Sequence, residues 1–403
     1  MESSQQQHSD SSGQLGAMME PLNSILKRAI AERATDVHID PIENGKTVRY
    51  RVDGIIHVKS PIEWRDRMKV LNQVKISANF SIDKSFMPQE GLISLPHEGK
   101  TQDIRVTVTP VGNRTAIHFR FLSASQFSHS LGDLGMAPDS IESIRTMLRA
   151  PSGLVLIVGS TGSGKSTSMY ALANAVDLKT KVAVSIEDPV EFRIPLIRQL
   201  QVDEFHGLTM SEGLRAILRM DPDVILVGEI RDQQSAVTAS RAALAGRLVL
   251  ATLHAPDAAT AVDALQNLSV PPYVIGGALR MILRQDLVRL VCGHCATHEP
   301  ITDEQRAMFE RHGVRPPVQV AVAGECMRCK GYGYLGRTGV FELSRIDKQL
   351  GRDISAGLHR GELEDCFRRA VQRTLIADAL RKAAAGETTV QEARHLVLAL
   401  QEE

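Results

Sequence analysis

The apolar positions in the first third of the chain follow helical and strand-like periods in turn. Apolar residues recur every three or four positions over 22–30 and again over 68–76, which predicts two helices. Short alternating runs predict strands, and Asp53-Gly54 predicts a two-residue hairpin turn. We therefore expect an α+β domain over residues 20–122. Its predicted strands are 37–39, 48–52, 55–58, 92–95, 104–108 and 116–121.

Beyond residue 135, helical segments alternate with short runs that are wholly apolar. Such runs suit the strands of a parallel sheet that helices cover on both faces. Each run ends in polar or charged residues, and the carboxyl ends of parallel strands meet at one edge of a sheet. We therefore expect one ligand site at that edge. The four runs are Leu154–Val158, Val182–Ile186, Val224–Val227 and Leu248–Leu253.

A glycine-rich sequence follows the first of these runs and carries the strongest chemical signal. Its spacing, G-x-x-x-x-G-K-S, lets backbone N–H groups turn toward the phosphates of a nucleotide. Lys165 supplies a positive charge, and the Ser166 hydroxyl can hold Mg²⁺. A Gly/Ser-rich turn that matches by chance is the alternative, but the strand before it and the helical segment after it favour a nucleoside triphosphate such as ATP. The predicted nucleotide-binding residues are Gly159, Ser160, Thr161, Gly162, Ser163, Gly164, Lys165, Ser166 and Thr167.

Acidic residues after two other runs are candidates for metal and water chemistry. Phosphoryl transfer needs a carboxylate that holds Mg²⁺ or orients the attacking water, and we predict Glu229 for this role. A solvent-exposed carboxylate at a strand end is the alternative for Glu229. Glu187, Asp188 and Glu191 are the next candidates, but the sequence does not divide the roles among them.

His254 follows the fourth run and has two interpretations. It could sense the γ-phosphate and pass its state to the next element, or it could be an ordinary core histidine with its hydrogen bonds satisfied. Its position at a strand end favours the functional interpretation.

Two C-x-x-C pairs, thirty residues apart, form a second strong signal. Cys292, Cys295, Cys326 and Cys329 can supply four thiolates from two tight turns, which predicts a closed, structural Zn²⁺ site. Disulfides are the alternative, but they fit poorly in a chain without a secretion signal. We place this zinc module at 290–340 and a helical part at 346–403.

Composition narrows the remaining possibilities. Lys plus Arg and Asp plus Glu both number 47, so the formal net charge is zero. The overall charge therefore gives no indication of a nucleic-acid-binding surface. Residues 1–19 are expected to be a disordered polar tail, and the Ser/Gly-containing segment 123–135 a linker to a second domain, 136–403. The sequence has no run of about 18 apolar residues, which a membrane-spanning helix would need. It also lacks the basic and apolar regions of a signal peptide, so we expect a cytoplasmic protein.

Taken together, several segments resemble the secretion ATPase superfamily, specifically the assembly ATPases of type II secretion and type IV pili. The resemblance extends over nearly everything from about Leu22 onward. The matching segments are Thr35–Pro41 and Arg49–Gly54 of the first domain, Ser185–Phe192 (similar to the Asp box), Gly213–Asp232 (Walker B region), Leu248–His254 (His box) and Gly331–Gly339 (after the tetracysteine motif).

The resemblance implies a PAS-like N-terminal domain, a RecA-like C-terminal ATPase domain with a mostly parallel sheet, and a ring of six copies. It also implies that arginines of the N-terminal domain reach the phosphates, and by position these are Arg105 and Arg120. A guanidinium that arrives on domain closure would stabilise charge in the transition state. Ordinary solvated arginines on strands are the alternative.

The function implied by this resemblance is that of a motor. We expect a homohexamer that hydrolyses ATP to assemble a type IV pilus or a type II secretion pseudopilus through an inner-membrane platform protein. Membrane association would be peripheral, through partners, and no direct contact with nucleic acid is expected. The alternatives are a competence pilus ATPase for DNA uptake and a nucleotide-gated scaffold that binds ATP without turning it over.

Overall fold

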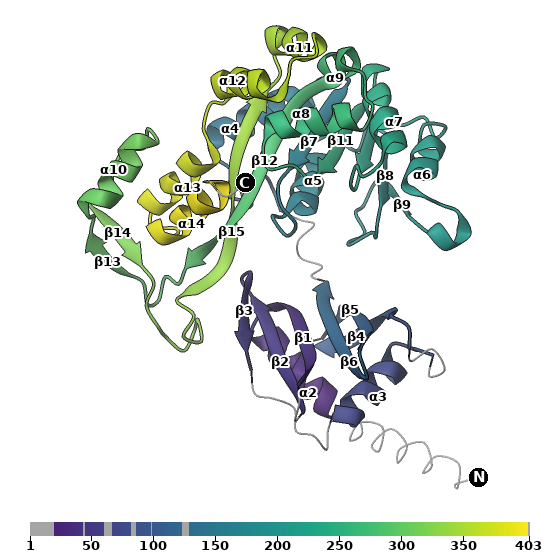
Figure 1. Cartoon of the computed structure of the whole chain (residues 1–403), viewed down its shortest axis with the longest axis vertical. Coiled ribbons are helices and arrows are strands. Elements are labelled where there is room, and N and C mark those ends of the chain that lie inside the picture. The colour runs from purple at the N-terminus through teal and green to yellow at the C-terminus, as the bar shows by residue number, and fades with distance from the viewer. Residues whose placement is uncertain are drawn as a thin grey trace. The chain divides into compact units, whose positions relative to one another are not determined.

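A computed structural model describes residues 20–42, 45–59, 67–81, 86–97, 99–122 and 129–401. The chain divides into two compact units, Met1–Ala124 and Ser125–Glu403, coloured purple to blue and blue to yellow in Figure 1. The tail expected at 1–19 and the linker residues 123–128 lie outside the described residues. Within the described ranges, no helix has both the length and the apolar character needed to cross a bilayer.

The described residues of the first unit form a six-stranded antiparallel sheet in the order β3-β2-β1-β6-β5-β4 and two helices, α2 (Glu20–Ala31) and α3 (Arg67–Ser77). The Leu22 N–H donates to the Gln73 side chain at 3.0 Å, which ties α2 to α3. Asp53 and Gly54 both have positive φ, as a tight hairpin turn between β2 and β3 requires. The strands are β1 (Ala34–Ile42), β2 (Gly45–Val52), β3 (Ile55–Val58), β4 (Gln89–His97), β5 (Lys100–Val111) and β6 (Arg114–Leu122).

The second unit is built on a seven-stranded sheet in the order β15-β12-β7-β11-β10-β8-β9. Six of its strands are parallel, and β15 pairs antiparallel with β12 at one edge. The four apolar runs predicted from the sequence form β7, β8, β10 and β11, in which every residue is buried. The strands are β7 (Gly153–Val158), β8 (Ala183–Glu187), β9 (Ile197–Gln201), β10 (Val224–Val227), β11 (Leu248–Leu253), β12 (Leu279–Val291) and β15 (Tyr334–Arg345).

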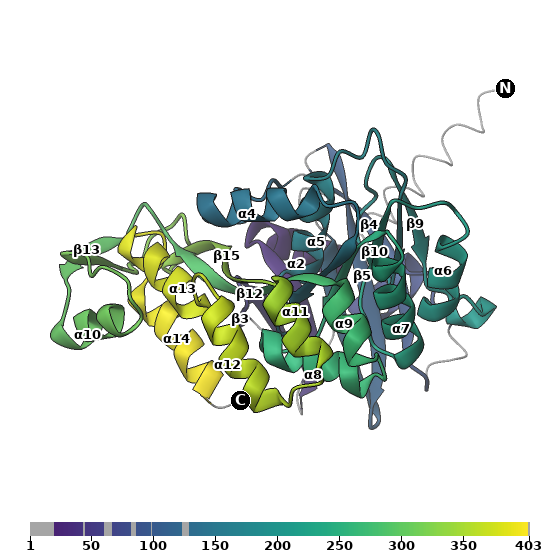
Figure 2. The same cartoon turned by 90° about the horizontal axis from the view of Figure 1, so that it is seen from above.

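Helices cover both faces of this sheet (Figure 2). Along β7, Leu154, Leu156 and Val158 join one apolar core, whereas Val155 and Ile157 join another, because successive side chains of a strand point to opposite faces. One core contains residues of α4 (Pro138–Leu148) and α5 (Lys165–Asn174). The other contains residues of α6 (Met210–Ile217), α7 (Gln233–Leu244), α8 (Ala258–Asn267), α9 (Pro272–Ala278), α11 (Lys348–Ser355) and α12 (Arg360–Ala370).

A third core lies where β12 and β15 extend beyond the other strands. Phe309 of α10 (Asp303–Arg311) packs there with Val288, Val340 and Leu380. A small antiparallel pair, β13 (Thr297–Pro300) and β14 (Gln319–Val322), flanks α10. The chain ends in helices, as predicted, with α13 (Leu375–Ala384) and α14 (Val390–Gln401) following α11 and α12.

The described part of the predicted linker packs within the second unit. Leu131 is buried, and the carbonyl of Leu134 accepts a hydrogen bond from the Gly339 N–H at 3.0 Å. Lys382 of α13 donates to the Gly135 carbonyl at 2.6 Å. These contacts fix residues 131–135 against β15 and α13.

Candidate nucleotide site and cysteine cluster

The glycine-rich loop connects β7 directly to α5. Gly159 and Gly164 have φ of +149° and +89°, and a Cβ atom on either would lie within 2.8 Å of Gln285. Glycine is therefore required at both positions, by backbone conformation and by space. Ser166 and Thr167 lie in the first turn of α5, whose unpaired backbone N–H groups favour a bound anion.

Lys165 begins α5 and folds back over its own loop. Its side chain is 8% exposed, and Nζ donates to the carbonyls of Gly159 and Ser160, each at 2.8 Å. Burial lowers the pKa of Lys165, and the carboxylates of Glu229 and Asp286 oppose that shift. The ammonium therefore lies in a poorly solvated position at the end of the sheet, where a phosphate can compensate its charge.

Glu229 and His254 follow two different strands and meet beside Lys165. Oε1 of Glu229 lies 2.8 Å from Nε2 of His254, and Nδ1 of the same ring lies 3.3 Å from Nζ of Lys165. Arg231 contacts the other oxygen of Glu229 at 2.7 Å and reaches Asp188 at 3.3 Å. One chain of polar contacts thus joins the loop to residues that follow β8, β10 and β11.

Glu187 ends β8 with a side chain that is almost fully buried, at 2% exposure. The Ser185 hydroxyl donates to its Oε1 at 2.5 Å, Gln199 donates to the same oxygen at 3.0 Å, and the Tyr170 hydroxyl donates to Oε2. Burial and the neighbouring Glu187 carboxylate raise the pKa of Tyr170, so its hydroxyl stays protonated and donates. Both carboxylate oxygens of Glu187 are therefore engaged by protein groups.

Arg105 and Arg120 of the first unit lie directly opposite each other across the β5–β6 ladder. Each has an acidic partner on a neighbouring strand: Glu90 lies 2.7 Å from Arg105, and Asp36 lies 3.0 Å from Arg120. Arg120 is still 59% exposed. The two arginines therefore lie on the same face of the sheet of the first unit, each paired with a carboxylate.

Gln285 is a residue at the loop that the sequence analysis did not identify. It lies in β12, is 3% exposed, and donates from Nε2 to the Ser163 carbonyl at 2.7 Å. No glycine pattern or charged motif marks it, and 122 residues separate it from Ser163. Only the pairing of β12 with β7 reveals the contact.

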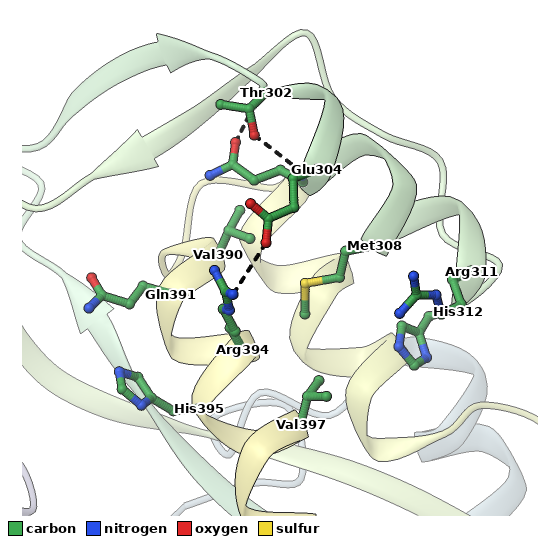
Figure 3. Close-up of a pocket in the computed structure, with 11 residues that line it drawn as sticks. Thr302, Glu304, Met308, Arg311, His312, Val390, Gln391, Arg394, His395 and Val397 are labelled. Atoms are coloured by element: carbon green, nitrogen blue, oxygen red, sulfur yellow. Dashed lines mark hydrogen bonds and ion pairs between the residues drawn. The ribbon is translucent and has the colours of Figure 1, made fainter. Parts of the chain in front are cut away.

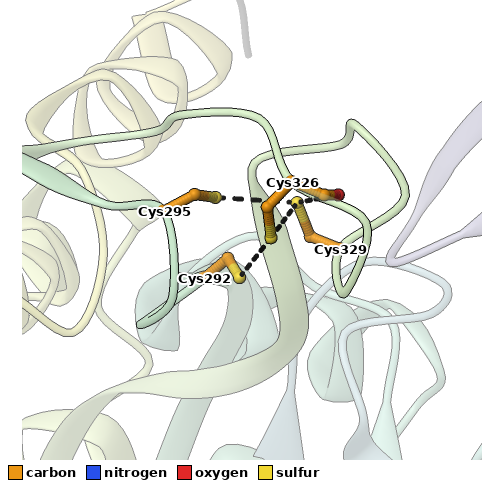
Figure 4. Close-up of side chains that lie close together, drawn as sticks. All are labelled: Cys292, Cys295, Cys326 and Cys329. Atoms are coloured by element: carbon orange, nitrogen blue, oxygen red, sulfur yellow. Dashed lines mark hydrogen bonds between the residues drawn. The ribbon is translucent and has the colours of Figure 1, made fainter.

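The four cysteines of the C-x-x-C pairs gather in one cluster, shown in Figure 4. Their Sγ atoms all lie within 4.8 Å of one another, and the closest pairs are 3.6 to 3.8 Å apart. Four thiolates at about 2.3 Å from one tetrahedral Zn²⁺ would be about 3.8 Å apart, whereas a disulfide needs about 2.05 Å. All five cysteines of the chain are free thiols, so the cluster fits zinc and not disulfides.

A separate cleft of about 760 Å³ lies between α10 and α14 (Figure 3). Arg394 on one wall pairs with Glu304 on the other at 3.2 Å. Apolar side chains such as Met308 and Val397 also line it. Every lining residue lies between 302 and 397, so the cleft shares no residue with the glycine-rich loop.

Comparison with known proteins finds relatives that match most of the chain. A model of the family described as "Type II/IV secretion system protein" matches residues 12–395. The Type II secretion system protein HxcR of Pseudomonas aeruginosa is 37% identical over 371 residues, which cover 92% of this chain and 75% of the relative. The Type IV pilus assembly ATPase PilB of Thermus thermophilus is 36% identical over 372 residues, covering 92% of this chain and 42% of PilB.

Solved structures of other ATPases have a similar fold. The Legionella pneumophila ATPase DotB is 20% identical and superposes with a TM-score of 0.67 over 94% of this chain and 95% of DotB. This likeness supports the architecture of the chain, and the sequence matches establish its family. The chain belongs to the Type II/IV secretion system protein family, the secretion and pilus assembly ATPases.

Proposed function

We propose that this protein is a hexameric motor that hydrolyses Mg²⁺-ATP to assemble a type IV pilus or a type II secretion pseudopilus. It would act in the cytoplasm, at the inner membrane, on a platform protein. The observation that carries the proposal is the contact chain from Lys165 through His254 to Glu229. These contacts bring the Lys165 ammonium close to an acidic residue at the carboxyl edge of a parallel sheet, where such sheets bind ligands. The names of the relatives support the pilus or secretion role.

The loop would bind the triphosphate through its backbone N–H groups and Lys165. Phosphate oxygens would replace the Gly159 and Ser160 carbonyls as acceptors for Nζ, with the advantage of opposite charge. Ser166 would hold Mg²⁺, and the metal would neutralise part of the charge that develops during transfer. Glu229 would bind that metal or orient the attacking water.

Glu187, Arg105 and Arg120 would complete the reaction. Glu187 would assist in activating water, which requires that one of its three hydrogen-bond donors give way to the water. Arg105 and Arg120 would leave their carboxylate partners, approach the phosphates as the two units close, and stabilise negative charge there. Opening and closing of each subunit would in this way depend on hydrolysis.

The cysteine cluster would hold a structural zinc ion. Its four ligands would close the coordination shell, so the metal would supply stability and no catalytic water. The Gly333 N–H points at the Cys329 sulfur at 3.3 Å and would stabilise it as a thiolate.

Phosphate release by the purified full chain, with zinc and Mg²⁺ present, tests this proposal. Lys165→Ala should weaken binding of a fluorescent ATP analogue and lower release roughly a hundredfold, because the phosphates lose their cation. Glu229→Gln should still bind the ATP analogue, but its phosphate release should fall about as much as that of Lys165→Ala. Lys348→Ala, on the exposed start of α11, is the matched control and should behave as wild type.

Three outcomes would contradict the proposal. Wild-type protein that binds the analogue but releases no phosphate would be a nucleotide-gated scaffold. Phosphate release that persists in both variants would mean that hydrolysis takes place at another site. A wild-type mass in solution that never reaches six chains, even with nucleotide, would exclude the hexamer.

A further inference from the structure

Gln285 meets the glycine-rich loop from the neighbouring strand β12. The register of β12 against β7 pairs Arg284 with Val158, so Gln285 is level with Gly159, the first residue of the loop. Its main-chain oxygen lies 2.3 Å from where a Cβ on Gly159 would be, and Nε2 lies 2.8 Å from where one on Gly164 would be. Both ends of the loop therefore pack directly on this one residue.

The hydrogen bond from Gln285 fixes the orientation of one peptide group. Nε2 donates to the carbonyl oxygen of Ser163 at 2.7 Å. In a planar trans peptide the C=O and the following N–H point in opposite directions. Holding the Ser163 carbonyl toward β12 therefore directs the N–H of Gly164 away from β12, toward the inside of the loop.

The arrangement leaves a polar atom of Gln285 unsatisfied. Its Oε1 is buried and has no hydrogen-bond partner among the residues that the structure describes. A buried acceptor without a partner costs stability, so a residue chosen for packing alone would be apolar here. The retained amide points to a role for its N–H group.

We propose that Gln285 is a positioning residue, which holds the Ser163–Gly164 peptide so that the loop presents its N–H groups to the phosphates of a nucleotide. This inference rests on the proposed function of the loop as a triphosphate site. Gln285 donates its hydrogen bond to the loop carbonyl and acts through Gly164, without touching the nucleotide. The nucleotide would find the loop already in its binding conformation and would not have to order it.

Two substitutions of similar size test the inference in the full chain. Gln285→Met removes the donor and keeps the volume, whereas Gln285→Glu replaces the donor by an acceptor that faces the Ser163 carbonyl. The Kd of a fluorescent ATP analogue with Mg²⁺ should rise about tenfold for Gln285→Met, the usual scale of one buried hydrogen bond. It should rise further for Gln285→Glu. The KM for ATP should rise with the Kd, while kcat changes less.

A matched control and the melting temperature separate positioning from stability. Gln349→Met, on the exposed face of α11, should bind as wild type. Binding is measured well below the melting temperature, so a loss of stability alone leaves the Kd unchanged. A Kd within twofold of wild type for both Gln285 variants would overturn the inference, whether or not the melting temperature falls. Wild type that binds but releases no phosphate would overturn the proposed hydrolysis and leave this comparison intact.

Discussion

His254 and Glu229 lie 2.8 Å apart, between Nε2 of the ring and Oε1 of the carboxylate. The other ring nitrogen, Nδ1, lies 3.3 Å from Nζ of Lys165. An ammonium can only donate, so Nδ1 accepts, and the proton of the neutral ring lies on Nε2, where it can be donated to Glu229. The ring therefore connects the cation of the loop to the acidic residue by hydrogen bonds of defined direction.

The first prediction concerns this connection. His254→Ala should lower kcat for ATP hydrolysis about tenfold and change nucleotide affinity less, because Glu229 loses its orienting donor while the loop remains. Steady-state phosphate release and a binding titration give the two quantities. His206→Ala removes an exposed histidine that pairs with Asp203 and serves as the control. Wild-type kcat in His254→Ala would show that the ring is an ordinary part of the packing.

The second prediction concerns the buried contacts of Glu187. Tyr170→Phe removes one donor to a carboxylate that is 2% exposed, so the free energy of unfolding of the second unit should fall by about 1–3 kcal/mol. Urea unfolding followed by circular dichroism measures the loss. Tyr273→Phe, on the exposed side of α9, should leave stability unchanged. An equally stable Tyr170→Phe would mean that another donor satisfies Glu187.

The third prediction concerns Asp36 and the pH dependence of stability. Burial alone would raise the pKa of Asp36, but hydrogen bonds from His118 and Arg120 outweigh burial and hold this pKa well below its ordinary value of 3.8. The folded state therefore gains stability above about pH 4 and loses it as the pH falls through the lowered pKa. Asp36→Asn should be about 2 kcal/mol less stable at pH 7 and less sensitive to pH between 4 and 2.

Circular dichroism, recorded as the pH is lowered, can follow this unfolding. Asp103→Asn is the matched control, since Asp103 is an aspartate of the same sheet that accepts an exposed hydrogen bond from the Ser94 hydroxyl. If wild type and Asp36→Asn lost stability equally below pH 4, Asp36 would not be the responsible group.

The fourth prediction concerns the cysteine cluster. Purified protein should contain one zinc ion per chain by elemental analysis, and Cys326→Ser should lose it and melt at a lower temperature. Cys366→Ser should keep the metal, because Cys366 lies outside the cluster. Wild-type protein prepared without chelators and free of zinc would contradict the prediction.

The sequence predicted the elements whose apolar pattern is simple. Residues 154–158 and 248–253 are apolar or small at nearly every position, and both are central strands of the parallel sheet. The strand β12 was not predicted, because Arg284, Gln285 and Asp286 interrupt its apolar residues. Its strand character comes from pairing with β7 and β15, which a local pattern does not reveal.

The residues of the candidate site also fall into two groups, those that the sequence indicates and those that only the structure reveals. The loop and the cysteine pairs carry spacings that their chemistry requires, and Glu229 follows an apolar run, so the sequence alone indicates all three. The residues that contact predicted site residues carry no such signal in the sequence. Gln285 donates to Ser163, 122 residues away, and Asp36 accepts from Arg120, 84 residues away. Such contacts depend on strand order and register, which only the folded chain establishes.

A structure of the chain with Mg²⁺ and a slowly hydrolysed ATP analogue tests the central claim most directly. We predict that the β- and γ-phosphates lie along residues 159–167, that Nζ of Lys165 contacts them in place of the Gly159 and Ser160 carbonyls, and that Mg²⁺ lies between Ser166 and Glu229. A triphosphate bound elsewhere, with Lys165 still on its own loop carbonyls, would contradict it.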